Sequence, residues 1–151
     1  MIDISLSKSN QQTLKTDIVF FGIGLHSGIQ ANVKITSDYP NSGITFIRTD
    51  LKENNIVKAL WHNVSATNLS TTISNEKKTS VSTIEHLMSA LSGMHIDNAR
   101  VYIDGPEVPI MDGSSKLFVE LIEKAKLQKQ DLPRKIIKVN KEVEVKKGDS
   151  F

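Results

Sequence analysis

Apolar and polar residues alternate over several short segments of the chain, a pattern typical of half-buried β-strands. Val33 and Ile35 alternate with polar neighbours, and residues 18–21 are apolar and rich in β-forming types. Residues 44–48 follow a turn cluster and are predicted to return along the preceding strand as a hairpin. Further strands are predicted at residues 56–61 and 98–103.

The segment that follows Ser82 has helical periodicity instead. Its apolar residues recur at i, i+3, i+4 and i+7 and are Ile84, Leu87, Met88 and Leu91. Ser82 and Glu85 have the Ser-x-x-Glu spacing of a capping box, and Gly93 suits the left-handed residue that ends a helix. The pattern predicts an amphipathic helix that begins beside Ser82 and ends at Gly93.

A second amphipathic helix is predicted near residue 118. Its apolar stripe is Phe118, Leu121, Ile122 and Ala125. Asp112, Ser114 or Ser115 can cap this helix, and residues 131–133 break it. Because strands cluster ahead of two helices, the order predicts an α+β two-layer sandwich: a largely antiparallel sheet with both helices on one face.

The last segment of the chain has a different character. Residues 136–139 and 143–145 are strand-like, and residues 146–149 form a turn signal. These features favour a first domain over residues 1–133, with residues 134–151 as the start of a second domain. The alternative is a C-terminal strand that joins the first sheet.

Composition and charge narrow the functional classes. The chain has 151 residues, enough for one domain, and a net charge of +2, which gives no argument for a nucleic-acid partner. It has no cysteine, so disulfides and thiolate metal sites are excluded. No apolar run approaches the ~20 residues that span a bilayer, and no signal peptide is visible at the N-terminus. A cytoplasmic protein without a membrane span is the default expectation.

Glu85 and His86 are the main candidates for chemistry, because both lie in the first turn of the predicted helix and outside its apolar stripe. The positive end of the helix dipole favours an ionised carboxylate and a neutral imidazole, the form that binds zinc. A carboxylate beside a metal can accept a proton from water. On these two residues alone, a capping glutamate followed by a surface histidine is the favoured interpretation.

Two loops carry further candidates. Residues 22–28 read Gly-Ile-Gly-Leu-His-Ser-Gly. The third glycine comes one residue later than in the dinucleotide-binding fingerprint, and a predicted strand follows instead of a helix. A tight turn is therefore favoured over nucleotide binding. His26 at the tip of this turn can still face a site. In residues 105–114, prolines and glycines fix the backbone from which Glu107 and Asp112 project. A rigid connector that ends in a helix cap is the simpler interpretation of this loop.

Together these segments resemble one family, the UDP-3-O-acyl-N-acetylglucosamine deacetylases, which are zinc amidases of lipid A biosynthesis in Gram-negative bacteria. The matching motifs are residues 22–28, residues 67–72 (Thr-Asn-Leu-Ser-Thr-Thr), residues 82–87 (Ser-Thr-Ile-Glu-His-Leu) and the run from Gly93 to Ser114. Their order and spacing both match over nearly the whole chain, which makes the resemblance specific.

The resemblance implies the first of two similar α+β sandwich domains with the active site between them. It implies that the N-acetyl group of a UDP-linked acylated glucosamine is hydrolysed and acetate released. Glu85 then corresponds to the general base and His86 to a ligand of a catalytic Zn²⁺. The implied substrate-binding residues, in a strand that lines the acetamide and acyl entrance and in two motifs near the site, are Leu69, Ser70, Thr71, His26 and Asp112.

One departure from the family pattern limits this expectation. The family takes its other two zinc ligands from a His-x-x-x-Asp motif in the second domain, and the sequence contains no such motif. A single imidazole binds zinc weakly. The chain is therefore expected to be the N-terminal half of the enzyme, inactive alone. The alternative is a non-catalytic remnant that binds a ligand or a partner.

Overall fold

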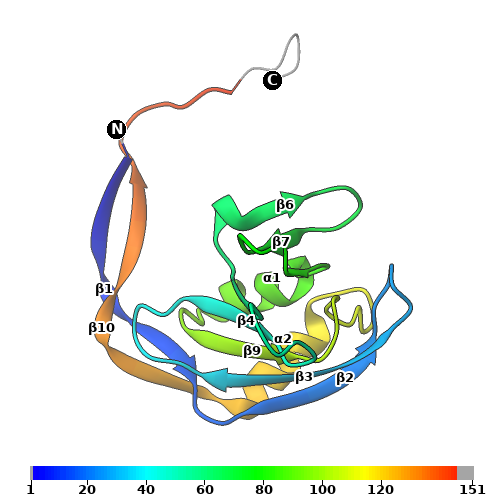
Figure 1. Cartoon of the computed structure of the whole chain (residues 1–151). Coiled ribbons are helices and arrows are strands. Elements are labelled where there is room, and N and C mark those ends of the chain that lie inside the picture. The colour runs from blue at the N-terminus through cyan, green and yellow to red at the C-terminus, as the bar shows by residue number, and fades with distance from the viewer. Residues whose placement is uncertain (1, 146–151) are drawn as a thin grey trace.

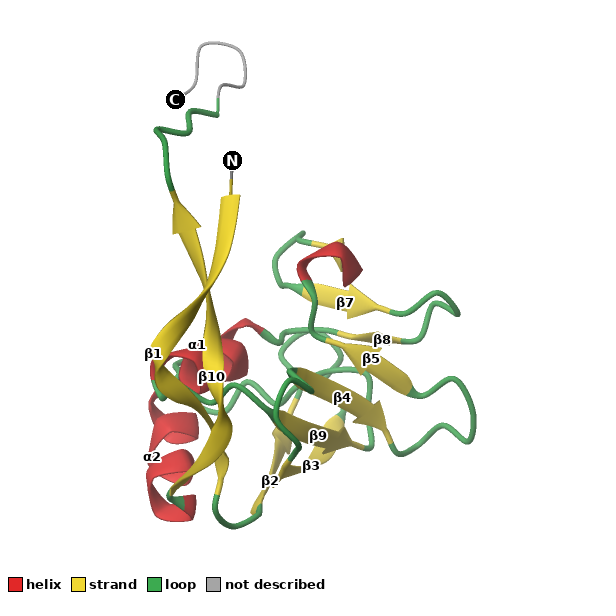
Figure 2. Cartoon of the chain, turned by 90° about the vertical axis from the view of Figure 1, so that its left-hand side faces the viewer, coloured by secondary structure: helices red, strands yellow, loops and turns green. Residues whose placement is uncertain are grey.

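Two helices cover one face of a five-stranded sheet (Figure 1, Figure 2). The computed structural model describes residues 2–145. The sheet order, from edge to edge, is β2 (Ile18–Ile23), β3 (Gln30–Ser37), β9 (Ala99–Ile103), β4 (Ile44–Arg48) and β5 (Ile56–Lys58). Only β4 and β9 pair in parallel, and the other pairs are antiparallel. The predicted α+β two-layer sandwich with a largely antiparallel sheet is confirmed.

The predicted hairpin between residues 33–36 and 44–48 is wrong. Strand β9 lies between β3 and β4, and its Val101 is paired with Ile35 on one side and Phe46 on the other. All three side chains are buried. An apolar strand that comes later in the chain gains more burial in the centre of the sheet than at its edge, which explains the insertion.

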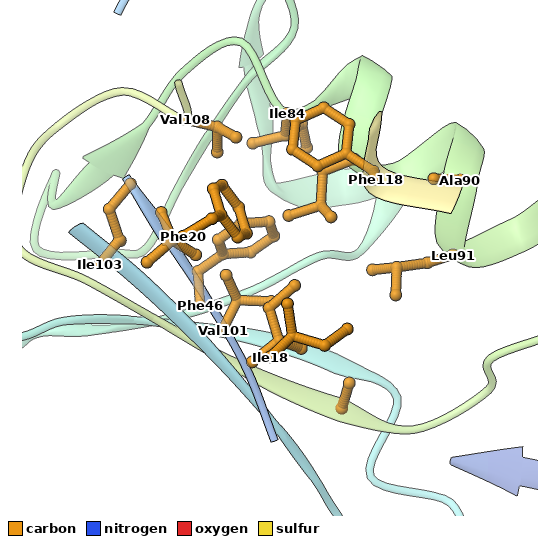
Figure 3. Packing of buried hydrophobic residues seen from close by; sticks show 14 of the residues in the cluster. Ile18, Phe20, Phe46, Ile84, Ala90, Leu91, Val101, Ile103, Val108 and Phe118 are labelled. Atoms are coloured by element: carbon orange, nitrogen blue, oxygen red, sulfur yellow. The ribbon is translucent and has the colours of Figure 1, made fainter. Parts of the chain in front are cut away.

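The core lies between the sheet and the helices α1 (Glu85–Gly93) and α2 (Lys116–Ala125). Both predicted apolar stripes face it, with Leu87 and Leu91 fully buried from α1 and Phe118 from α2. The rings of Phe20 and Phe118 meet edge to face, with centroids 5.5 Å apart (Figure 3). Each such side chain contributes about 1.5–3 kcal/mol by burial. No helix among residues 2–145 is both long and apolar enough to cross a membrane.

A small second sheet lies beyond β5 (Figure 2). It follows a 3-10 turn (Trp61–Asn63) and consists of β6 (Val64–Ala66), β7 (Thr72–Ser74) and β8 (Ser80–Val81). Ile73 and Val81 are buried and attach this sheet to the main core. The loop between β6 and β7 is thereby brought to the first turn of α1.

Strands β1 (Ile2–Leu14) and β10 (Leu127–Val139) form a long antiparallel ribbon that projects from the body (Figure 1). Its register runs from Leu14 opposite Leu127 to Ile2 opposite Val139. Residues 134–139 thus continue a strand that begins inside the first predicted domain, and they pair with β1. Residues 143–145, predicted as strand, are irregular, and the predicted turn at 146–149 lies outside the described residues.

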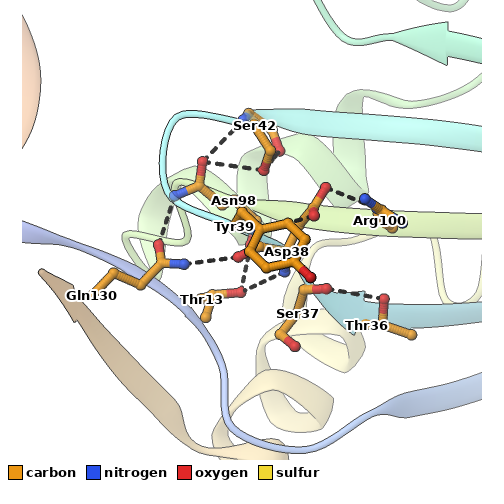
Figure 4. A network of polar contacts seen from close by, with 10 residues as sticks. Thr13, Thr36, Ser37, Asp38, Tyr39, Ser42, Asn98, Arg100 and Gln130 are labelled. Carbon is orange, nitrogen blue, oxygen red and sulfur yellow. Dashed lines mark hydrogen bonds and ion pairs between the residues drawn. The ribbon is translucent and has the colours of Figure 1, made fainter. Parts of the chain in front are cut away.

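A buried polar network fixes the base of this ribbon to the sheet (Figure 4). The Asn98 amide donates to Gln130 Oε1 at 2.6 Å, and Thr13 Oγ1 donates to the Asn98 carbonyl at 2.6 Å. Next to it, Arg100 forms an ion pair with Asp38 at 2.9 Å. Burial raises the pKa of Asp38, but the hydrogen bonds from Arg100 and the Tyr39 N–H outweigh burial and lower it.

Candidate active site

Glu85 is the first residue of α1, and the loop before β7 holds its carboxylate. Glu85 Oε2 accepts the Thr71 backbone N–H at 2.9 Å, and the Ile84 N–H donates back to the Thr71 carbonyl at 3.3 Å. The predicted capping box is wrong, because Ile84 occupies the N-cap and the Ser82 hydroxyl donates to the Pro106 carbonyl. The Glu85 carboxylate is therefore fixed at the positive end of a helix without acting as its cap.

His86 follows in the same turn and is half-buried. Its backbone carbonyl accepts the Ser115 hydroxyl at 3.0 Å, which connects the start of α1 to the start of α2. This bond uses the main chain and leaves the imidazole for another partner. Glu85 and His86 are thus both positioned through contacts with loops distant in sequence.

Leu69, Ser70 and Thr71 lie in the loop that precedes β7, rather than in a strand as expected. Leu69 has a left-handed φ of 65° and is 90% exposed, the largest value among the exposed apolar side chains of the described residues. Non-glycine residues adopt this conformation rarely, and where they do, the strain often marks a functional loop. The loop presents an apolar side chain to solvent two residues ahead of Thr71, whose N–H holds the Glu85 carboxylate.

The glycine loop that carries His26 is held by Glu107, a carboxylate that is only 2% exposed. Glu107 Oε1 accepts the His26 N–H at 3.0 Å and the Thr83 hydroxyl at 2.7 Å, and Oε2 accepts the Ser27 N–H at 2.7 Å. Burial alone would raise the pKa of Glu107, but these hydrogen bonds to the ionised form lower it to about 2. The His26 side chain remains exposed.

The spacing of the glycines in this loop follows from the same contact. A Cβ on Gly24 would lie 2.4 Å from Glu107 Oε2, and a Cβ on Gly22 would lie 2.9 Å from Pro109 Cβ. The prediction of a tight turn between two strands is confirmed, since the loop joins β2 to β3. Its glycines permit close approach to residues 107–109 rather than to a phosphate.

Gly24→Ala is expected to lower the free energy of unfolding by about 1–3 kcal/mol, because the new methyl group must displace a buried carboxylate. Gly93→Ala is the matched control: Gly93 is helical, and nothing lies within 4 Å of its added Cβ. That control should raise the free energy of unfolding by about 0.5–1 kcal/mol. Urea denaturation measures both, and equal effects of the two substitutions would contradict the close approach described above.

Asp112 lies on the exposed loop before α2 and binds its own neighbourhood. Its Oδ1 accepts the Ser114 N–H at 3.0 Å and the Ser114 hydroxyl at 2.9 Å, which lowers the pKa of Asp112. Of the three predicted cap residues, Ser114 accepts the backbone N–H of Lys116, the first residue of α2, at 3.1 Å, whereas Ser115, at the N-cap position, makes no side-chain cap bond. The loop that ends at Ser115 nevertheless reaches His86.

Comparison with known proteins identifies the family. The family model for UDP-3-O-acyl N-acetylglycosamine deacetylase matches residues 11–151. The chain belongs to this deacetylase family. It is 44% identical over 143 residues to a UDP-3-O-acyl-N-acetylglucosamine deacetylase of Myxococcus xanthus, which covers 95% of the chain and 45% of that relative. The Syntrophus aciditrophicus deacetylase is 40% identical over 93% of the chain and 44% of the relative.

The chain thus spans less than half the length of the curated deacetylases that it matches. A zinc site, which the family resemblance implies, can be tested against the donors present. Among residues 2–145, no group of three histidine, cysteine, aspartate or glutamate side chains can hold a metal ion. His86 offers one imidazole, so the described part of this family member does not form a complete zinc site.

Glu107 is the residue of this family member that sequence reasoning passed over as part of a rigid connector. The structure brings it together with His26 and with Thr83, two residues ahead of Glu85. Two features of the sequence could have drawn attention to Glu107. It lies between two prolines, and the Gly-x-Gly spacing of residues 22–24 had no explanation. Neither segment alone shows that the two meet.

Proposed function

We propose that this chain supplies the general base and one zinc ligand of a UDP-3-O-acyl-N-acetylglucosamine deacetylase. The observation that carries the proposal is the Glu85 carboxylate, which the Thr71 N–H holds at the N-terminus of α1 beside His86. Family membership and the names of the relatives support the same activity. The remaining zinc ligands must then come from polypeptide other than residues 2–145.

The chemistry required of this chain is proton transfer. Hydrolysis of an N-acetyl group bonds a water oxygen to the acetyl carbon, breaks the C–N bond and yields acetate and a free amine. Glu85 would accept the proton that the water loses, because one carboxylate oxygen is committed to the Thr71 N–H and the other remains available. Zinc, when bound, would polarise the carbonyl and acidify the water, and His86 would be one of its ligands.

The proposed substrate-binding residues lie on three separate loops. Leu69, Ser70 and Thr71 lie on the side of the small sheet, while His26 and Asp112 lie on the glycine loop and on the loop before α2. The exposed Leu69 side chain suits the acyl part of such a substrate, and the His26 imidazole suits its polar part. These assignments extend the family resemblance.

A second function class is binding without hydrolysis. The absence of a three-ligand group among residues 2–145 favours it for this chain by itself. A chimera separates the two classes: this chain replaces the matching 45% of the Myxococcus xanthus deacetylase. With zinc and UDP-3-O-acyl-N-acetylglucosamine, we expect acetate release from the chimera and none from the 151-residue chain. Turnover by the chain alone would contradict the need for further ligands, and a folded but inactive chimera would favour the binding module.

A further inference from the structure

The Glu107 side chain joins two segments that are far apart in sequence. On one side its carboxylate accepts the backbone N–H groups of His26 and Ser27, and on the other it accepts the hydroxyl of Thr83. Two residues of the exposed glycine loop and Thr83 are thereby fixed to one buried group. Hydrogen bonds to an ionised carboxylate are stronger than hydrogen bonds between neutral groups, so three of them fix these segments firmly.

The backbone around Thr83 shows that this contact is built in rather than incidental. The Ser82 N–H donates to the Pro106 carbonyl at 2.9 Å, and the Val108 N–H donates to the Ser82 carbonyl at 3.0 Å. Thr83 itself has a φ of 55°, a strained conformation for a β-branched residue. In this conformation the Thr83 hydroxyl donates to Glu107, two residues before α1 begins. Backbone strain of this kind persists where surrounding contacts enforce it.

We propose that Glu107 is a positioning residue, which sets the His26 loop at a fixed place relative to the first turn of α1 and therefore relative to Glu85 and His86. This inference rests on the proposed function for its catalytic consequence. Glu107 is too deeply buried to touch substrate, and its three acceptor contacts are all taken by the protein. It acts on the reaction only through the placement of other residues.

The first test is hydrogen exchange of backbone amides, followed by NMR in the 151-residue chain. Glu107→Gln replaces one acceptor oxygen by an amide donor that opposes a backbone N–H. We expect exchange at His26 and Ser27 to accelerate about tenfold or more, the loss of one charge-assisted hydrogen bond. Amides that open locally elsewhere, such as that of Lys78 in the turn after β7, should change less than about twofold, because they do not contact Glu107. Glu123→Gln, an exposed glutamate on α2, is the matched control and should change neither set.

The second test is catalytic and uses the chimera. Glu107→Gln is expected to lower kcat about tenfold or more with a smaller change in KM, since misplacement of the catalytic groups affects the reaction more than binding. Thr83→Val keeps the shape and charge of the site and removes one donor. We expect Thr83→Val to accelerate exchange at His26 about threefold. If Glu107→Gln does not fold, the test uses Thr83→Val instead.

Unchanged exchange at His26 and Ser27, or equal acceleration at every amide, would overturn the positioning role. Full activity of the Glu107→Gln chimera would overturn it as well. The proposed function fails on different evidence, namely an inactive parent chimera or a fully active Glu85 variant. If the parent chimera is inactive, the exchange experiment alone decides the role of Glu107.

Discussion

Replacement of Glu85 by alanine in the chimera is expected to lower kcat by about 10²- to 10⁴-fold, the usual contribution of a general base. The reason lies in the geometry at the start of α1. The carboxylate is fixed by the Thr71 N–H, and Glu85 is the acidic residue in the first turn of α1. Zinc content, measured by atomic absorption after dialysis, should stay that of the parent, because the proposed ligand is His86.

Glu85→Gln separates proton transfer from structure in this experiment. Glutamine keeps an oxygen that can accept the Thr71 N–H, but it cannot accept a proton from water. Both variants should therefore be equally inactive. If the glutamine variant were active and the alanine variant inactive, Glu85 would serve only to hold the loop. Glu120→Gln, on α2, provides a control for the loss of one charge.

Sequence periodicity correctly predicted the strands and helices that bury one apolar face of their own. Strand β3 alternates buried and exposed positions as expected, and β9 alternates buried and half-buried positions. Leu87 and Leu91 of α1 lie in the core for the same reason. In each case a single apolar face decides the local conformation, and the period of that face can be read from the sequence.

Contacts between distant segments could not be predicted in this way. The Ser82 hydroxyl donates to the Pro106 carbonyl, so tertiary pairing removed the capping box that its spacing to Glu85 suggested. At the other end of α1, the left-handed residue is His95, with a φ of 58°, rather than Gly93. The pairing of β1 with β10 joins two segments that are far apart in the sequence, and nothing in the sequence of either strand indicates which strand it pairs with.

The candidate site shows the same division. Motif resemblance pointed to the segments that carry Glu85, His86 and His26, and the structure places all of them around the start of α1. What holds these segments together is Glu107, and its contacts need the folded arrangement to be seen. The Gly-x-Gly spacing, which resembled a phosphate loop, is explained by the close approach of Gly24 to that carboxylate.

Glu107 should also make the protein sensitive to acid. Its pKa is about 2 in the folded protein, below the ordinary value of 4.5. A carboxylate with a lowered folded-state pKa stabilises the fold above its unfolded pKa, and that contribution is lost as the pH falls toward the folded value. At about 1.4 kcal/mol per pH unit, the difference corresponds to about 3 kcal/mol, lost between roughly pH 4.5 and pH 2.

The experiment compares urea unfolding of the parent chain and Glu107→Gln across this range. At pH 7 the variant should be less stable by about 3 kcal/mol or more, because it also leaves a buried backbone donor without an acceptor. As the pH falls from 4.5 to 2, the difference should narrow, since only the parent loses the contribution of an ionised Glu107. The other carboxylates with lowered pKa values, Asp38, Asp50 and Asp112, titrate in both proteins and cancel in the comparison. A difference that stays constant with pH would show that Glu107 stabilises the fold by packing rather than by its charge.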